Sequence, residues 1–156
     1  MKMVVEERSP KEFTTLMIKI GRIQLFIVGF LIVGLVSLGQ EFIYYWLGSD
    51  FEKSYYAIVL VLLPCLIHMT QGIANELIFA KNKIKYRALV YILGSFISVV
   101  SIVFLAPNMG AIGAAIGVFL AFVIAHEFIM NIIYYKVLKL NIVRFFKECH
   151  AKMILP

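Results

Sequence analysis

Residues 111–135 read AIGAAIGVFLAFVIAHEFIMNIIYY, and this stretch decides the fold. Its one charged side chain is Glu127. About 20 helical residues are enough to cross the hydrocarbon core of a bilayer, so the stretch predicts a membrane-spanning helix. Small residues at a four-residue spacing let helices approach closely in membranes, which predicts tight packing against a second helix. These small residues are Gly113, Gly117, Ala121 and Ala125.

Three further stretches, 20–38, 55–79 and 88–105, are long and apolar enough to cross a bilayer. We therefore expect an all-α, polytopic membrane protein with a four-helix transmembrane domain over residues 20–135. The connections are short, so consecutive helices are expected to lie antiparallel as neighbours. Pro64 is expected to kink the second helix, and residues 106–110 are expected to form a tight turn.

The composition excludes several classes of protein. Hydrophobic residues make up 62% of the chain, charged residues make up 15%, and the mean hydropathy is +0.93. A soluble domain of this size buries only about 70% of its chain surface, which is too little to hide so much apolar area. A water-soluble enzyme, a disulfide-linked secreted domain and a disordered tail are thereby excluded.

Short interfacial helices are expected at both ends of the chain. Ser9 and Glu12 form a capping-box pattern around Pro10, which predicts that residues 1–19 are a cytoplasmic amphipathic segment lying along the membrane surface. Residues 136–156 are expected to be a basic cytoplasmic or interfacial tail. Within this tail, Asn141 is expected to cap a short helix, and the final residues read like the start of a further helix, so we expect the chain to be truncated there.

The basic residues predict the orientation in the membrane. All of the 15 Lys and Arg residues except Lys53 fall on one side of the four expected crossings. The positive-inside rule then places both termini of a multi-pass membrane protein in the cytoplasm. The net charge of +6 lies in the connections between apolar stretches, so no nucleic-acid partner is expected.

No motif of a known enzyme class is found. The chain has no HExxH, GxSxG, P-loop or GxGxxG pattern, and its two cysteines, Cys65 and Cys149, have no metal-ligand spacing. We therefore expect no catalytic residue, no cofactor and no metal site. Functional residues are sought among polar groups inside the apolar helices, because such groups are costly in lipid and usually face a helix bundle or a wet cavity.

The second helix has the densest set of such groups. His68, Gln71 and Asn75 are spaced i, i+3 and i+7, which places them on one helical face. They are candidates to line a polar substrate path, where amide groups can both donate to and accept from sugar hydroxyls. The alternative is that Gln71 and Asn75 join this helix to a neighbour by hydrogen bonds. Glu76 is expected to form an ion pair with the basic loop after it, or else to couple proton movement.

Two more candidates lie on the fourth helix and one on the first. Glu127 and Asn131 are one turn apart, and a carboxylate at that depth needs a proton, a cationic partner or a substrate contact. A structural ion pair at Glu127 remains an equal alternative. Arg22 is a candidate to bind a pyrophosphate, because guanidinium groups bind phosphate oxygens in a bidentate manner. It is otherwise an anchor at the cytoplasmic edge.

Three stretches carry a family resemblance: WLGSDFEKS at 46–54, AKNKIKYR at 80–87 and LAPNMGAIGAA at 105–115. In this order they resemble the C-terminal half of bacterial polysaccharide repeat-unit flippases, in the multidrug/oligosaccharidyl-lipid/polysaccharide superfamily. The resemblance implies part of a MATE-like lobe beside a cationic central cavity. It also implies export of undecaprenyl-pyrophosphate-linked oligosaccharide across the cytoplasmic membrane, for the synthesis of surface polysaccharide such as lipopolysaccharide or capsule.

The resemblance also implies partners. These are the lipid bilayer, the lipid-linked oligosaccharide and further transmembrane helices, supplied by a parent protein or a partner subunit, since such flippases have more crossings than four. Two alternatives remain open: a cation-coupled drug antiporter of the same superfamily, and a stand-alone four-span accessory protein. A membrane-bound glycosyltransferase or acyltransferase is disfavoured because no acidic or His motif lies at an interface.

Overall fold

The structure, a computed structural model, describes residues 9–151, and this part of the chain is helical without any β-strand. Three helices are long and apolar enough to cross a membrane: Pro10–Leu47, Ser49–Thr70 and Ile84–Lys136. The expected all-α class is therefore confirmed, and the three helices are compatible with a membrane location. Residues 1–8 of the expected amphipathic segment, and the expected start of a further helix at 152–156, lie outside the described residues.

The first long helix, α2 (Pro10–Leu47), begins with the expected cap. The backbone N–H of Glu12 donates to the Ser9 hydroxyl at 3.4 Å, and the backbone N–H of Ser9 donates to the Glu12 carboxylate at 2.8 Å. The helix then continues without interruption through residues 20–38. Residues 10–19 thus belong to the same helix as the first apolar stretch, because no Gly or Pro follows Pro10 before Gly21 to break it.

The second long segment is interrupted at Gln71. A short 3-10 turn, η1 (Ser49–Phe51), leads into α3 (Glu52–Thr70), and α4 (Gly72–Ala80) follows after Gln71. Gln71 has φ −97° and ψ 13°, outside helical values, and Gly72 follows it directly. The break therefore falls at Gln71, directly before a glycine, a residue that is unfavourable inside a helix. Pro64, where we expected the kink, lies within α3.

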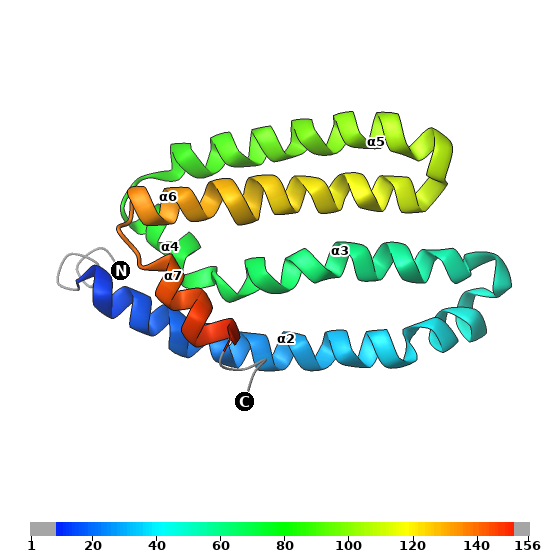
Figure 1. The fold of residues 1–156 in the computed structure, drawn as a ribbon, viewed down its shortest axis with the longest axis horizontal. Helices are drawn as coiled ribbons and strands as arrows, with labels where there is room; N and C mark the ends of the chain where they lie inside the picture. Colours follow the sequence, from blue (N-terminus) through cyan, green and yellow to red (C-terminus); the bar gives the residue numbers. More distant parts are fainter. Residues whose placement is uncertain (1–8, 152–156) are drawn as a thin grey trace.

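The third long segment folds back on itself at Gly110. Helix α5 (Ile84–Ala121) contains Gly110 at φ 59° and ψ −136°, a conformation that a residue with a Cβ atom rarely adopts. We call residues 84–109 the first arm and residues 111–136 the second arm. The second arm continues from α5 through the π-helix η2 (Phe122–Ile129) into α6 (Met130–Lys136), antiparallel to the first (Figure 1).

The small residues of the second arm pack against the first arm, as expected. A Cβ atom built on Gly113 would collide with the backbone carbonyl of Leu105 and would lie 3.0 Å from the backbone nitrogen of Ala106. At Gly117 it would lie 2.9 Å from the side chain of Ile102. The Cβ atom of Ala125 faces Gly94 in the same way. The stripe thus brings the two arms into backbone contact.

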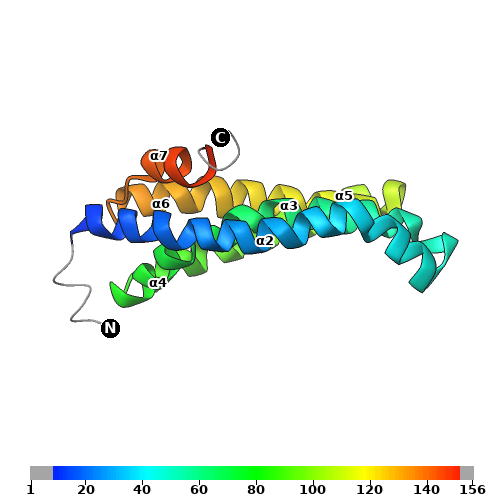
Figure 2. The same cartoon turned by 90° about the horizontal axis from the view of Figure 1, so that it is seen from below.

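The order of the helices in space differs from their order in the sequence. The second arm lies between α3 and the first arm (Figure 1). We expected α3 and the first arm to be neighbours, and the structure shows that they are not. Turned by 90°, the long helices overlap in a thin band and form a single layer (Figure 2). The small-residue stripe explains the difference, because it pairs the two arms tightly and leaves the opposite side of the second arm for α3.

A short helix crosses one face of this layer. It consists of α7 (Ile142–Phe145) and the π-helix η3 (Phe146–Ala151), and we call residues 142–151 the C-terminal helix. Asn141 caps it as expected, accepting from the backbone N–H of Arg144 at 2.9 Å. The C-terminal helix packs on the start of α2, where the backbone N–H of Asn141 donates to the Thr14 hydroxyl at 3.2 Å. Phe145 and Cys149 are buried in this contact.

Basic residues gather at one end of the molecule. The start of α2, the α4–α5 turn, the end of α6 and the C-terminal helix all meet at this end (Figure 1). Within the described residues, Lys53 beside η1 is the one Lys or Arg near the opposite end. We call the crowded end the basic end. The described basic residues there are Lys11, Lys19, Arg22, Lys81, Lys83, Lys85, Arg87, Lys136, Lys139, Arg144 and Lys147.

Candidate transport groove

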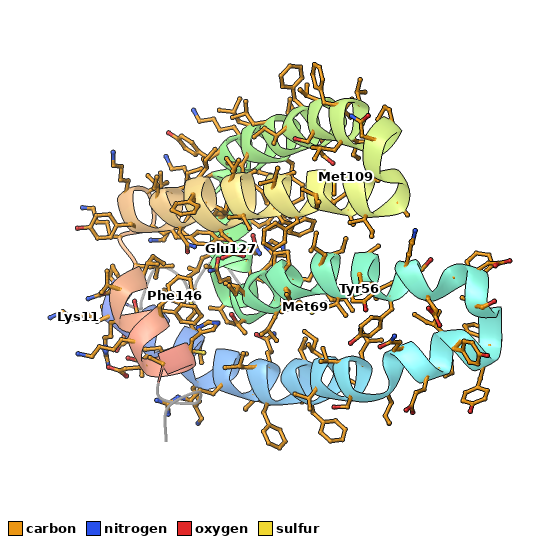
Figure 3. All side chains as sticks on the ribbon, turned by 45° about the vertical axis from the view of Figure 1, so that its right-hand side comes forward. Lys11, Tyr56, Met69, Met109, Glu127 and Phe146 are labelled. Atoms are coloured by element: carbon orange, nitrogen blue, oxygen red, sulfur yellow. The ribbon has the colours of Figure 1, made fainter. Side chains whose placement is uncertain are left out.

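A groove of about 810 Å³ runs between α3 and the second arm. Leu63 and Ile67 of α3 line one wall, Phe119 and Glu127 line the other, and Phe146 of the C-terminal helix lies at the basic end. Figure 3 labels Glu127 and Phe146 on these two elements. The volume of the groove is within the range of roughly 300–1,000 Å³ typical of small-molecule pockets.

Three polar side chains line this otherwise aliphatic and aromatic groove: Glu127, Asn131 and His150. Both carboxylate oxygens of Glu127 and the amide oxygen of Asn131 are buried without a hydrogen-bond partner among residues 9–151. The Asn131 amide nitrogen donates to the backbone carbonyl of Glu127 at 2.5 Å, which fixes the direction of the amide oxygen. Within residues 9–151 no cation lies within ion-pair distance of Glu127, so the structural ion pair that we considered is not formed there.

His150 closes the groove from the C-terminal helix. The Thr70 hydroxyl donates to the backbone carbonyl of Ile67 at 2.7 Å, so its oxygen accepts from Nε2 of His150, 3.3 Å away. This assigns the Nε2–H tautomer and leaves Nδ1 as an acceptor, which is buried and has no partner in the described part of the chain. Burial lowers the pKa of His150 below its ordinary value, because the charged imidazolium loses hydration there.

Gln71 lies at the break between α3 and α4. It is fully buried, and neither atom of its side-chain amide has a hydrogen-bond partner in the described part of the chain. Its backbone carbonyl accepts from the N–H groups of Ala74 and Asn75, which starts α4. The buried side-chain oxygen of Gln24, on α2 near Gly72, also has no partner among the described residues. The unsatisfied amide group of Gln71 and this oxygen form a polar site inside the layer, beside the helix break.

His68 faces the second arm rather than an open path. Its ring centroid is 5.1 Å from that of His126 and 6.2 Å from that of Phe122. His126 also stacks edge-to-face on Tyr91 of the first arm at 4.6 Å. The Tyr91 hydroxyl in turn accepts from Arg87 at 3.2 Å. This row of rings joins α3 to both arms, and His126 lies on the π-helix, a form that is frequent at functional sites.

Asn75 makes a buried hydrogen bond between helices. Its side-chain oxygen accepts from the Tyr134 hydroxyl at 2.8 Å, joining α4 to α6. This is the interhelical bond that we considered as the alternative to a substrate path. Glu76, the next residue, is exposed, and it makes no ion pair within 4.0 Å in the described chain. The ion pair expected with the following basic loop is therefore absent there.

Arg22 lies outside the groove. Its guanidinium donates two hydrogen bonds, at 3.2 and 3.0 Å, to the backbone carbonyl of Glu148. Arg22 is exposed at the basic end and ties the C-terminal helix to α2. Beside this bond, burial raises the pKa of the Cys149 thiol, and the positive charge of Arg22 opposes part of that rise. This geometry fits an anchor at the helix end.

Two residues of the groove, His150 and Phe146, are not predicted from the sequence, because nothing in the local pattern of the expected interfacial tail shows that it folds back over α3. Tyr134 does not line the groove, but its bond to Asn75 is also not predicted. The signal for that bond is that the hydroxyl group of a buried tyrosine usually needs a partner.

No protein-family model, curated protein or solved structure matches this chain.

Proposed function

We propose that this chain is a membrane-embedded part of a transporter that flips lipid-linked oligosaccharide across the bacterial cytoplasmic membrane. The observation that carries the proposal is the groove, in which Glu127, Asn131 and His150 have unpartnered acceptor atoms among apolar walls. Sugar hydroxyls donate hydrogen bonds to such acceptors, and a hydrocarbon chain fits the apolar walls. The resemblance of 46–54, 80–87 and 105–115 to polysaccharide flippases names the substrate class, undecaprenyl-pyrophosphate oligosaccharide.

In this proposal the chain crosses the membrane four times, with both termini in the cytoplasm. The turn at Gly110 divides residues 84–136 into two antiparallel arms, each long enough for a crossing. The basic end then faces the cytoplasm. A pyrophosphate would lie near this end, where Lys and Arg residues are concentrated. The groove has walls from this chain on two sides and one end, so further helices, from a parent protein or a partner subunit in a MATE-like lobe, would complete the path.

Deletion of the gene in its own host tests this proposal. We expect surface polysaccharide to be lost and lipid-linked oligosaccharide to accumulate in the inner leaflet of the membrane. Wild-type chain should restore export, and Glu127→Leu should not, because it removes the acceptors of the groove. Glu76→Leu is the matched control, since Glu76 is exposed and does not line the groove. Unchanged surface polysaccharide in the deletion strain would refute the proposal.

A further inference from the structure

We infer that the groove between α3 and the second arm binds a single-chain amphiphile whose polar head is a primary ammonium group. The inference concerns binding in the groove and not export, so it can hold where the transport proposal fails. It rests on three properties of the lining residues: the type of hydrogen-bonding atom they offer, the charge they present, and the order of polar and apolar residues along the groove.

The unpartnered polar atoms of the groove are all acceptors once the existing bonds are counted. Nε2 of His150 is used by Thr70, which leaves Nδ1 as an acceptor. The amide nitrogen of Asn131 donates to a backbone carbonyl of its own helix, and its amide oxygen has no partner among the described residues. Glu127 adds two carboxylate oxygens. A ligand that satisfies these atoms must bring donors, and a primary ammonium brings three N–H groups.

The charge of the residues that line the groove also favours a cationic ligand. Within the described chain the lining includes Glu127 but no Lys or Arg. A buried carboxylate is stabilised by a cation that also donates hydrogen bonds to it. A phosphate head would bring further acceptors and like charge to Glu127, so the groove disfavours it. A quaternary ammonium carries the charge but has no N–H donor.

The arrangement along the groove matches the polarity of a single-chain lipid whose head lies toward the basic end. Glu127 and Asn131 are nearer the basic end of the second arm, and Phe119 is two turns farther from it. On α3, Leu63 and Pro64 line the far part of the groove. The head therefore lies beside Glu127 and Asn131, and the hydrocarbon chain extends toward the middle of the layer. One polar end and a volume of about 810 Å³ suit a single chain.

Photolabelling tests this inference directly. The full chain is reconstituted in phosphatidylcholine vesicles and exposed to dodecylamine that carries a diazirine in its alkyl chain. Sites of attachment are mapped by peptide mass spectrometry. We expect saturable labelling at Phe119 and Phe128, which line the groove, above the background at the exposed lipid-facing residue Phe30. An excess of unlabelled dodecylamine should abolish the saturable labelling. An excess of dodecanol or dodecyl phosphate should not reduce it.

Two variants separate the carboxylate from general packing. Glu127→Gln keeps the shape and removes the charge, so saturable labelling should fall about tenfold. Glu76→Gln is the matched control and should label as the wild type does. Equal thermal unfolding of both variants shows that they are folded. Wild-type labelling in Glu127→Gln would overturn the inference, as would equal competition by dodecanol. Replacing phosphatidylcholine by phosphatidylethanolamine should not change the labelling. If it abolished the labelling, the occupant would be a two-chain aminolipid instead.

Discussion

At the scale of single residues, the hydrogen-bonding state of each buried polar side chain separates structure from candidate function. The side chain of Asn75 accepts a hydrogen bond from Tyr134, and the side chain of Arg22 donates to the backbone carbonyl of Glu148. Glu127 and Gln71 have buried side-chain atoms without partners in the described residues. A buried polar group without a protein partner costs free energy unless water or a ligand satisfies it, which makes these two side chains the candidates for binding.

The Tyr134–Asn75 bond should contribute measurably to stability. Tyr134→Phe removes the donor and leaves the buried oxygen of Asn75 unsatisfied, so we expect the free energy of unfolding to fall by about 1 kcal/mol. Reversible unfolding in mixed detergent micelles measures this. Tyr135→Phe is the control, because Tyr135 is 63% exposed and Tyr134 is fully buried. Equal stability of the two variants would show that the bond contributes nothing.

At the scale of secondary-structure elements, the close approach of the two arms depends on the absence of a side chain at Gly113. The backbone carbonyl of Leu105 occupies the position that a side chain would need. Backbone cannot move aside as the end of a flexible side chain can, so the arms would have to separate. The pairing of the arms also positions His126 and Glu127, which lie on the same π-helix.

Gly113→Leu should therefore lower the free energy of unfolding by about 1–3 kcal/mol or more through overpacking. Gly34→Leu is a matched control in a different apolar helix, because a Cβ atom at Gly34 meets nothing within 4 Å. Thermal unfolding of the purified variants compares the two. A Gly113→Leu protein as stable as Gly34→Leu would contradict the packing of the arms described above.

The C-terminal helix should detach at acidic pH. Folding lowers the pKa of His150, so the detached helix binds a proton more tightly than the packed one. The packing is therefore most favourable above the ordinary histidine pKa of about 6.5 and weakens as the pH falls below it. We expect amide exchange in 142–151, relative to intrinsic rates, to rise on acidification. His150→Gln should remove this pH dependence, and an unchanged profile in that variant would exclude His150 as its cause.

At the scale of the whole molecule, sequence reasoning predicted the elements better than their arrangement. The helix class, the Ser9 and Asn141 caps and the small-residue stripe all depend on neighbours close in sequence, and the structure confirms them. The turn is shorter than the expected 106–110, because residues 106–109 are helical and the backbone leaves helical geometry at Gly110. The break at Gln71 was missed because Pro64 is the stronger local signal. The groove was missed because it depends on which helix lies beside α3 and on the fold-back of residues 142–151, neither of which has a local signature.

The membrane topology can be tested with single cysteines in a Cys65→Ser, Cys149→Ser background. Ser49→Cys and Asn108→Cys lie at the end opposite the basic end, and Asn82→Cys lies in the α4–α5 turn. In spheroplasts we expect a membrane-impermeant maleimide to label the first two. Asn82→Cys should react only after permeabilisation, because the proposed topology places the basic end in the cytoplasm. If Asn108→Cys and Asn82→Cys were labelled from the same side, residues 84–136 would not make two crossings.

The position of the second arm between α3 and the first arm has a consequence for biosynthesis. A ribosome completes α3 and the first arm before it makes the helix that separates them. Until residues 111–136 leave the ribosome, His68 lacks the rings of Phe122 and His126, and the first arm lacks its main contact. The nascent chain therefore holds the first arm without its partner helix, whereas α3 already packs against α2. A pause in translation before Gly110 would prolong the interval in which the insertion machinery or a chaperone must shield the first arm.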